Sequence, residues 1–273
     1  MSKPVEQIKR CDPVWERVRT EAAEMTSAEP ILASFLYSVV LNHDNFNDAL
    51  SYLLAQKLAN SQVSGMQLRE LFDEALAAAP ELGDACRADI VAYYDRDPAC
   101  HSYIQPLLYF KGFHALQAYR IAHWLWGQKR VAMALYLQNR MSDLFSVDIH
   151  PAARIGRGVF IDHATGIVIG ETAVVEDDVS MLHGVTLGGT GKETGDRHPK
   201  VRRGVLISVG AKVLGNIEIG ECARIGAGSV VLQAVPAHCT AVGVPAKVVG
   251  CAGCDQPSHA MDHIIKDEPD DDA

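Results

Sequence analysis

The chain has 273 residues, which is enough for one large domain or two of modest size. Its composition is that of a soluble globular protein, and the net charge of −9 argues against nucleic acid or an anionic membrane as a partner. No stretch reaches the roughly eighteen apolar residues that cross a membrane, and Met1 to Trp15 lacks the apolar core of a signal peptide, so we expect a cytoplasmic protein. The scattered cysteines, seven in number, suit reduced thiols in that compartment.

The N-terminal half, residues 1–145, predicts a helical domain. Apolar residues recur there at spacings of three and four, for example at Leu68, Leu71 and Phe72, and strand signals are almost absent. Asp97 comes directly before a proline and therefore at a helix end or a turn, where a neutralised surface charge is the default interpretation.

From Val147 to Gly250, aliphatic residues recur every six positions. Steps of six from Ile149 meet a β-branched residue or an alanine as far as Val185, and the same step from Val201 continues to Val231. A period of six fits neither a helix nor a simple strand. It is typical of a parallel β-helix in which each hexapeptide forms one side of a three-sided coil of about 18 residues. An ordinary sandwich of short strands is the alternative.

The expected architecture is therefore α+β, in three parts. The helical domain covers residues 1–145, the β-helix covers residues 146–250, and residues 251–273 form a flexible, disordered acidic tail. Cys251 and Cys254 have the spacing of a redox or zinc-binding pair, but no second pair accompanies them.

The six-residue register breaks between Val185 and Val201, which are sixteen residues apart. Part of this glycine-rich segment must leave the coil as a loop. The loop contains Arg197, His198 and Lys200, and a flexible basic loop on an acidic protein suggests anion capture. It lacks the spacing of a Walker A loop, and a merely solvated loop is the alternative.

Three polar residues interrupt the aliphatic pattern at Asp148, Asp162 and His163. Asp148 and His163 are fifteen residues apart, three short of one coil, so the two side chains could lie on neighbouring coils within reach of each other. A carboxylate that orients an imidazole is typical of a general base. The alternative is a pair of corner residues that hydrogen-bond to turns.

Five segments carry a resemblance to a known family. They are Tyr-Phe-Lys-Gly-Phe-His-Ala-Leu-Gln-Ala-Tyr-Arg120, Val-Asp-Ile-His-Pro-Ala-Ala153, Asp-His-Ala-Thr-Gly166, Val-Thr-Leu-Gly-Gly-Thr-Gly191 and Gly-Asp-Arg-His-Pro-Lys200. Together with the helical domain they resemble the serine O-acetyltransferases, a family of the hexapeptide-repeat acetyltransferase superfamily. The likeness runs from about Ala33 to Pro245, and the repeats alone would indicate only the superfamily.

The resemblance implies a left-handed β-helix that forms trimers, with the helical domains pairing two trimers into a hexamer. It implies transfer of the acetyl group of acetyl-CoA, as co-substrate, to the hydroxyl of L-serine, the first step of cysteine synthesis. No metal is required, and inhibition by L-cysteine is expected. By motif match, His163 would be the general base and Asp148 the carboxylate that orients it.

The resemblance also implies the binding groups. Asp97 and Asp162 would meet the ammonium of serine and Arg197 its carboxylate, with His198 and Glu171 nearby. Candidate contacts of CoA are the backbone near Ala211, Ala227 and Gly228 and the side chain of Lys212. Relatives that bind O-acetylserine sulfhydrylase insert a C-terminal isoleucine into that enzyme, whereas this chain ends in Ala273. We therefore do not expect that complex, unless Ile264 and Ile265 substitute.

Other functions stay open at this point. A zinc-dependent β-helix lyase of the carbonic anhydrase type would need three convergent histidines, for which His150, His163 and His183 could be proposed. Their spacings of 13 and 20 are not those expected of one stacked row. Another hexapeptide acetyltransferase, acting on a sugar or drug, would give no reason for the helical domain. A non-catalytic scaffold would be insensitive to the loss of His163.

Overall fold

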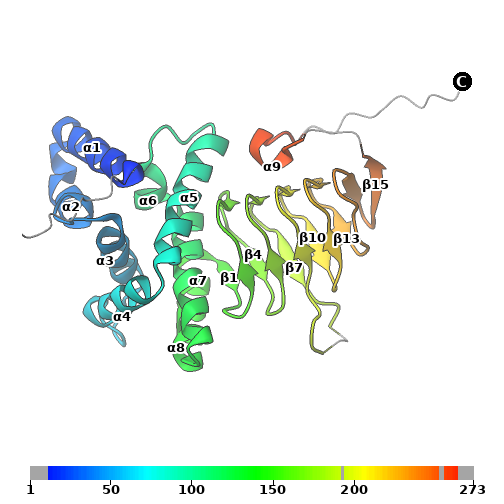
Figure 1. Cartoon of the computed structure of the whole chain (residues 1–273), viewed down its shortest axis with the longest axis horizontal. Coiled ribbons are helices and arrows are strands. Elements are labelled where there is room, and N and C mark those ends of the chain that lie inside the picture. The colour runs from blue at the N-terminus through cyan, green and yellow to red at the C-terminus, as the bar shows by residue number, and fades with distance from the viewer. Residues whose placement is uncertain (1–11, 192–193, 252–254, 264–273) are drawn as a thin grey trace, which may run out of the picture.

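The computed structural model describes residues 12–191, 194–251 and 255–263. A group of helices packs beside a parallel β-solenoid, and the last helix of the group leads directly into the first strand (Figure 1). The helices are α1 (Pro13–Ala28), α2 (Ala33–Leu36), α3 (Phe46–Leu58), α4 (Gly65–Ala78), α5 (Pro80–Arg96), α6 (Ile104–Tyr109), α7 (Lys111–Gly127) and α8 (Val131–Phe145). This order agrees with the predicted helical half, and β1 begins at Val147.

Polar residues at the helix starts explain where these helices begin. Asn45 accepts a hydrogen bond from the backbone N–H of Asp48 and caps α3. Ser64 and Gln67 bond reciprocally to each other's backbone at the start of α4, which satisfies two amides that a helix otherwise leaves unpaired. Within the described segments, no helix combines the length and the apolar character needed to cross a membrane.

The solenoid has three faces, each a sheet of short stacked strands. Face 1 contains β1 (Val147–Ile149), β4 (Ile167–Ile169), β7 (Thr186–Gly188), β10 (Lys212–Leu214) and β13 (Val230–Val231). Face 2 contains β2 (Arg154–Ile155), β5 (Val174–Val175), β8 (Lys200–Val201) and β11 (Glu218–Ile219). Face 3 contains β3 (Phe160–Ile161), β6 (Ser180–Met181), β9 (Leu206–Ile207), β12 (Arg224–Ile225), β14 (Thr240–Gly243) and β15 (Ala246–Gly250). We call the turns from face 3 to face 1 corner 3–1, and those from face 1 to face 2 corner 1–2.

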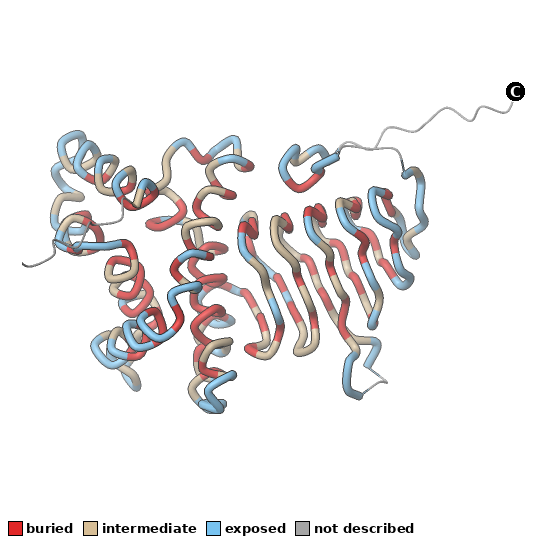
Figure 2. Tube along the Cα trace, viewed as in Figure 1, coloured by how far each residue is buried: buried red, intermediate tan, exposed pale blue. Residues whose placement is uncertain are grey.

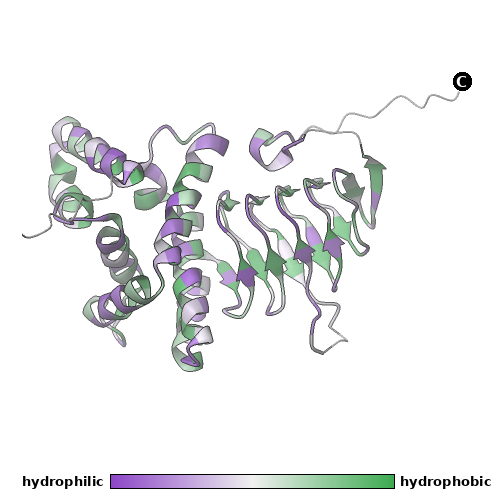
Figure 3. Ribbon diagram, viewed as in Figure 1, coloured by the Kyte–Doolittle hydropathy of each residue, from purple (hydrophilic) through white to green (hydrophobic). Residues whose placement is uncertain are grey.

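The core of the solenoid consists of the aliphatic residues that point into each coil. Figure 2 shows buried residues along the inner side of the coils and on the helices that face them. Hydrophobic residues are likewise concentrated on the strands of face 1 (Figure 3). The period of six therefore indicated the correct class of fold.

The predicted register, however, changes after Ile161. The first coil is 20 residues long, because Phe160 pairs with Ser180, whereas Val168 pairs with Thr186 after only 18. Two extra residues in the turn between β3 and β4 account for the difference. The hexapeptide row thus continues at Ile169, Val175, Met181 and Leu187. The predicted row (Ile167, Ala173, Val179, Val185) lies two residues earlier and is also buried, since alternate residues of a strand face the same side.

The predicted loop leaves the coil between β7 and β8. Thr186 pairs with Lys212 after 26 residues, eight more than the ordinary coil. The pairing on both sides of the loop stays in register, so the extra residues project from corner 1–2 without disturbing the stack (Figure 1). Lys200 fastens the end of the loop, because its ammonium donates to the backbone oxygens of Thr172 and His198.

The first coil has no earlier coil to pair with, so its outer edge would leave backbone groups without partners. Side chains of α5 and α7 take that place. Asp89 accepts a hydrogen bond from the N–H of Val159 at 2.9 Å, and Arg120 donates to the carbonyl of Gly156 at 2.7 Å. Asp89 and Arg120 also form an ion pair of 2.7 Å that is almost fully buried. The helices therefore cap the solenoid with polar groups as well as by apolar packing.

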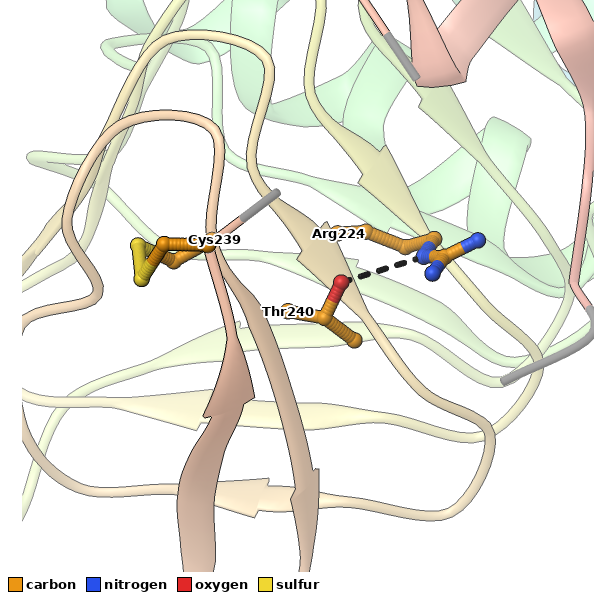
Figure 4. Close-up of a disulfide and its surroundings, with 4 residues drawn as sticks. Arg224, Cys239 and Thr240 are labelled. Carbon is orange, nitrogen blue, oxygen red and sulfur yellow. Dashed lines mark hydrogen bonds between the residues drawn. A yellow bond between two sulfur atoms is a disulfide. The ribbon is translucent and has the colours of Figure 1, made fainter. Parts of the chain in front are cut away.

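Two of the cysteines correct the expectation of reduced thiols. Cys239 and Cys251 form a disulfide (Figure 4). β15 returns antiparallel to β14, so the residue before Thr240 meets the residue after Gly250. Spacing along the chain could not show this pairing, because it depends on the reversal of the last strand. Cys254 lies outside the described residues.

The start of the predicted tail packs against the protein. Helix α9 (Pro257–Ala260) contacts α5, and the hydroxyl of Ser180 donates to the backbone oxygen of Ser258 at 2.8 Å. His263 lies 2.9 Å from the hydroxyl of Ser208. Residues 255–263 thus contact both the helical half and the solenoid. The expectations for residues 264–273, including the role of Ala273, fall outside the described residues.

Candidate active site

Asp162 and His163 lie in the turn of residues 162–166 at corner 3–1, which contains the two extra residues of the first coil. We call it the His163 turn. His163 and Ala164 both adopt left-handed backbone conformations, with φ of 54° and 58°. Two consecutive residues of this kind are unusual outside glycine. The side chain of Ala164 is buried, whereas that of His163 is 72% exposed, so the turn raises the imidazole above the coil.

A cavity of about 270 Å³ lies between the His163 turn and the ends of α5, α6 and α7. Asp97, at the end of α5, lines it together with Asp162 and His163. The imidazole Nε2 of His163 is 3.5 Å from Asp162. Burial raises the pKa of Asp162, the charge of His163 opposes that rise, and the carboxylate of Asp97 adds to it. The cavity thus combines two carboxyl groups with one imidazole, an arrangement that suits a small ligand carrying an amine and a hydroxyl.

A second polar cluster occupies corner 1–2. Arg197 forms an ion pair of 2.8 Å with Glu171, and the hydrogen bond from Arg197 lowers the pKa of that carboxyl. The hydroxyl of Thr172 accepts hydrogen bonds from the backbone N–H groups of Arg197 and His198. This cluster therefore holds a guanidinium and an imidazole at the base of the loop.

The hydrogen bonds of His198 show which ring nitrogen carries the proton. The backbone N–H of Thr172 donates to Nδ1 of His198 at 3.2 Å, so the proton of the neutral ring is on Nε2. Burial lowers the pKa of His198, and the adjacent Arg197 lowers it further, which favours that neutral form. The ring lies so close to Gly170 that a Cβ there would be 2.0 Å from Nε2. Glycine is therefore required beneath this histidine.

The two clusters lie at opposite ends of face 1. The His163 turn precedes β4, whereas Glu171 follows it, and a strand of three residues is about 10 Å long. A single chain therefore does not bring Arg197 and His198 to the cavity that Asp97, Asp162 and His163 share.

Asp148 also lies apart from His163. It is on β1, its partner on the next coil is Val168, and its carboxylate accepts a hydrogen bond of 2.7 Å from Gln138 of α8. No hydrogen bond or ion pair joins Asp148 to His163 within the residues described. The physical reason is the longer first coil: in a coil of 20 residues, Asp148 stacks on the residue five positions beyond His163.

The same two extra residues correct the interpretation of the other histidines. His163 and His183 are one coil apart, and their ring centroids are 5.7 Å from each other. The spacing of 20 is thus that of a stacked row in this coil. His150 lies at corner 1–2 instead, so the three histidines proposed for zinc do not converge.

A column of glycines runs down corner 3–1. It contains one residue from each of four coils, with φ between 66° and 77°, namely Gly166, Gly184, Gly210 and Gly228. Gly184, Gly210 and Gly228 each donate the N–H to a carbonyl of the preceding coil, and Gly166 donates to the carbonyl of Ser146 at the end of α8. A Cβ on Gly184 would be 3.4 Å from the Cα of Gly210. Because all four residues are glycines, the column forms a flat strip without side chains, which we call the strip along corner 3–1.

The candidate contacts of CoA lie in different surroundings. Ala227 and Gly228 are exposed on the strip. Lys212 points outward from β10 and donates to the carbonyl of Gly184. Ala211, by contrast, is fully buried; its N–H donates to the carbonyl of Ser208, and its C=O accepts from the N–H of Thr186 on the neighbouring coil.

Tyr93 and Lys111 also line the cavity, and neither was among the predicted site residues. Tyr93 is on α5, and Lys111 begins α7. Lys111 belongs to the Tyr-Phe-Lys-Gly motif, which was the available signal, whereas Tyr93 lies outside every motif and has the pattern of an ordinary core residue.

Comparisons with known proteins identify the family of this chain. Residues 14–118 match the family model described as serine acetyltransferase, N-terminal. The serine acetyltransferase of Salmonella typhimurium is 59% identical over 249 residues, which cover 91% of each chain. A solved Brucella abortus serine acetyltransferase in complex with coenzyme A has a TM-score of 0.89 and 54% identity, covering 91% of this chain and 99% of that one. A serine acetyltransferase in complex with cysteine has a TM-score of 0.91 and 56% identity, covering 93% and 98%. The chain belongs to the serine acetyltransferase family.

Proposed function

We propose that the chain transfers the acetyl group of acetyl-CoA to the hydroxyl of L-serine, giving O-acetyl-L-serine and CoA in the first step of cysteine synthesis. The observation that carries this proposal is the cavity shared by Asp97, Asp162 and His163. Two carboxyl groups suit the ammonium of an amino acid, and the imidazole suits a hydroxyl that must lose its proton. Family membership and the relative that holds coenzyme A support the same reaction.

The reaction follows from the roles of these groups. Asp97 and Asp162 bind the ammonium of serine and place its hydroxyl beside His163. The neutral imidazole accepts the hydroxyl proton as the oxygen attacks the thioester carbon. The tetrahedral intermediate then breaks its carbon–sulfur bond, and the imidazolium returns the proton to the departing CoA thiolate. His163 is therefore unchanged after each turnover, and no acetyl-enzyme forms.

The most direct test is the release of free thiol from acetyl-CoA in the presence of different acceptors. We expect release to depend on L-serine, with D-serine and threonine at most about a tenth as effective, since the carboxylate and ammonium fix the position of the hydroxyl. A chelator should leave the rate unchanged. Thiol release that is independent of L-serine would contradict the proposed reaction.

The complete site forms between two copies of the chain in this proposal. One copy supplies the cavity at corner 3–1, and its neighbour supplies corner 1–2 with Arg197 and His198, and Asp148 from face 1. The support is that each copy carries two different half-sites at opposite ends of one face. Contacts between different surfaces close into a ring, and a three-sided solenoid favours a trimer. In that arrangement Arg197 meets the carboxylate of serine and Asp148 orients the His163 of the adjacent copy.

Exposed apolar residues support further assembly. Ile31, Phe35, Tyr37 and Met66 are exposed on the helical half, where they suit contact with a second trimer. This surface is distinct from face 1, so pairing of helical domains would give the expected hexamer.

Mixing two inactive variants tests the shared site. When His163→Ala and Arg197→Ala chains are coexpressed, trimers that contain both hold one site with the two residues intact. Random mixing should therefore restore about a quarter of the unmutated thiol-release activity. Each variant expressed alone serves as the control. If coexpression restores no activity, both residues act within one chain, or do not belong to one site.

The strip along corner 3–1 suits the extended arm of CoA. It leads from His163 past Gly184 and Gly210 to the exposed Ala227 and Gly228. Lys212 on the adjacent face supplies a positive charge. A thiol that ends beside His163 would then have the rest of its chain lying along the flat strip.

L-cysteine is the expected inhibitor in this proposal. It carries the same ammonium and carboxylate as serine, so the same acidic and basic groups would bind it, and one solved relative holds cysteine. Location in the cytoplasm is also part of the proposal, because acetyl-CoA is an intracellular substrate.

A further inference from the structure

Tyr93 is a buried polar residue that the mechanism above does not use. Its side chain is 1% exposed, and its phenol lies directly beneath the His163 turn. The hydroxyl donates to the carbonyl of Ile161 at 2.9 Å and accepts from the N–H of the same residue at 3.3 Å. Burial raises the pKa of this phenol well above its ordinary value, so the hydroxyl keeps the proton that it donates.

Ile161 needs these bonds because it lies on the outer edge of the first coil. Its neighbours Phe160 and Asp162 donate their N–H groups to the second coil, at 3.0 and 2.9 Å. The backbone N–H and C=O of Ile161 point the other way, toward α5, where no strand of the described residues lies. Tyr93 thus supplies both halves of a missing strand pairing at the residue directly before Asp162 and His163.

The helical half also touches the rest of the His163 turn. Lys111 donates to the hydroxyl of Thr165 at 2.5 Å. Gly112 is so close that a Cβ there would be 2.2 Å from the carbonyl of Ile161 and 3.2 Å from the side chain of Ala164. The turn is therefore fastened before and after His163 by residues of α5 and α7.

The ring of Tyr93 is itself fixed. Its centroid is 4.8 Å from that of Phe160, 5.9 Å from that of Phe110 and 6.0 Å from that of Phe113. These contacts leave the hydroxyl a single position. The hydroxyl therefore holds the backbone of Ile161 in a fixed position.

We propose that Tyr93 is a positioning residue, which sets the place of the His163 imidazole in the reaction through its two bonds to Ile161. This inference rests on the proposed acetyl transfer. His163 and Ala164 hold left-handed conformations that few residues adopt unaided, so the turn needs fixed ends. A displacement of a catalytic group by about 1 Å lowers the rate by up to a hundredfold.

Replacing Tyr93 by phenylalanine removes the hydroxyl and keeps the ring. We expect kcat to fall about ten- to a hundredfold. The KM for acetyl-CoA should change by less than about twofold, because Tyr93 bonds to Ile161 of the first coil, whereas the exposed Ala227 and Gly228 of the strip lie on a later coil. A lower kcat with a nearly unchanged KM is the result that a positioning role predicts.

Tyr119 offers a matched control on the same edge. It is equally buried, and its hydroxyl donates to the carbonyl of Ala153 on the outer edge of the first coil. Tyr119→Phe therefore removes a hydrogen bond between the helical half and the first coil, as Tyr93→Phe does, but at a place away from the His163 turn. We expect it to lower the midpoint of thermal unfolding to a similar extent as Tyr93→Phe, while kcat stays within about twofold of the unmutated chain.

The outcomes separate the possibilities. Unchanged kcat in Tyr93→Phe, or an equal loss in both variants, would overturn the positioning role. If Tyr93→Phe does not fold, Thr165→Val decides, since it removes the exposed contact with Lys111: a kcat reduced about threefold or more supports the proposal, and an unchanged one overturns it. The unmutated chain is assayed first, so a failure of acetyl transfer itself is distinguished from a failure of this inference.

Discussion

Replacing His163 by alanine lowers the turnover number of acetyl transfer to L-serine by about a hundredfold or more, because a positioned general base contributes 10² to 10⁴ in rate. The side chain is 72% exposed and packs little against the core, so we expect the free energy of unfolding to change by less than about 0.5 kcal/mol. Thiol release measures the first quantity, and thermal or urea unfolding measures the second. Loss of activity without loss of stability assigns the effect to chemistry.

His238 provides the control for this experiment. It is also an exposed histidine in a turn of the solenoid, and its φ of 57° resembles the 54° of His163, but it lies on the last coil. His238→Ala should therefore keep full turnover. If His163→Ala retains turnover within about twofold of the unmutated chain, the imidazole is not the base and the proposed mechanism fails.

Replacing Arg120 by methionine should destabilise the protein by about 3–5 kcal/mol, the usual cost of leaving one partner of a buried ion pair alone. Asp89 has no exposed surface, and the Arg120 side chain is 6% exposed. The carbonyls of Ile155 and Gly156 lose a donor at the same time. Urea unfolding followed by circular dichroism measures the loss.

The stability lost in Arg120→Met should depend on pH. Burial raises the pKa of Asp89, and Arg120 opposes that rise. Without Arg120 the folded carboxyl takes up a proton that the unfolded chain does not hold, so folding is favoured as the pH falls. The stability lost in Arg120→Met is therefore smaller at pH 5 than at pH 8.

The ion pair of Arg130 with Glu74 serves as the comparison. Its distance is 2.8 Å, similar to that of the buried pair, but the two side chains are 41% and 54% exposed. Arg130→Met should cost less than about 1 kcal/mol. Equal losses in the two variants would show that the Arg120 pair does not anchor the helices to the coil.

The class of fold could be predicted from the sequence, because a coil with three equal sides places an inward-pointing aliphatic residue at every sixth position. It was insufficient for the register, because two extra residues preserve the alternation of buried and exposed positions. Aliphatic residues occupy both buried rows, for example Ile167 and Ile169, so the shift leaves no break in the pattern. That shift is the reason why Asp148 does not stack near His163 and why His183 does.

The sequence named the residues of the proposed site but not their arrangement in space. The motifs indicated Asp97, Asp162 and His163, and the structure brings these three to one cavity. They also indicated Arg197 and His198, which the fold of one chain holds at another corner. In the proposed site a neighbouring copy supplies these two residues, and a sequence does not record which copy of a chain supplies a residue. The disulfide was missed for a related reason, because the partner of Cys239 depends on the direction of the last strand.

The capped first coil has a consequence for how the molecule behaves in a crowded solution. Stacked coils resemble the units of a fibril, since any free edge can accept another strand of the same kind. Here the polar side chains of α5 and α7 already occupy the hydrogen-bonding positions of that edge. Polymerisation end to end is thereby blocked at the first coil, and the helical half protects the enzyme from filament growth as well as shaping its cavity.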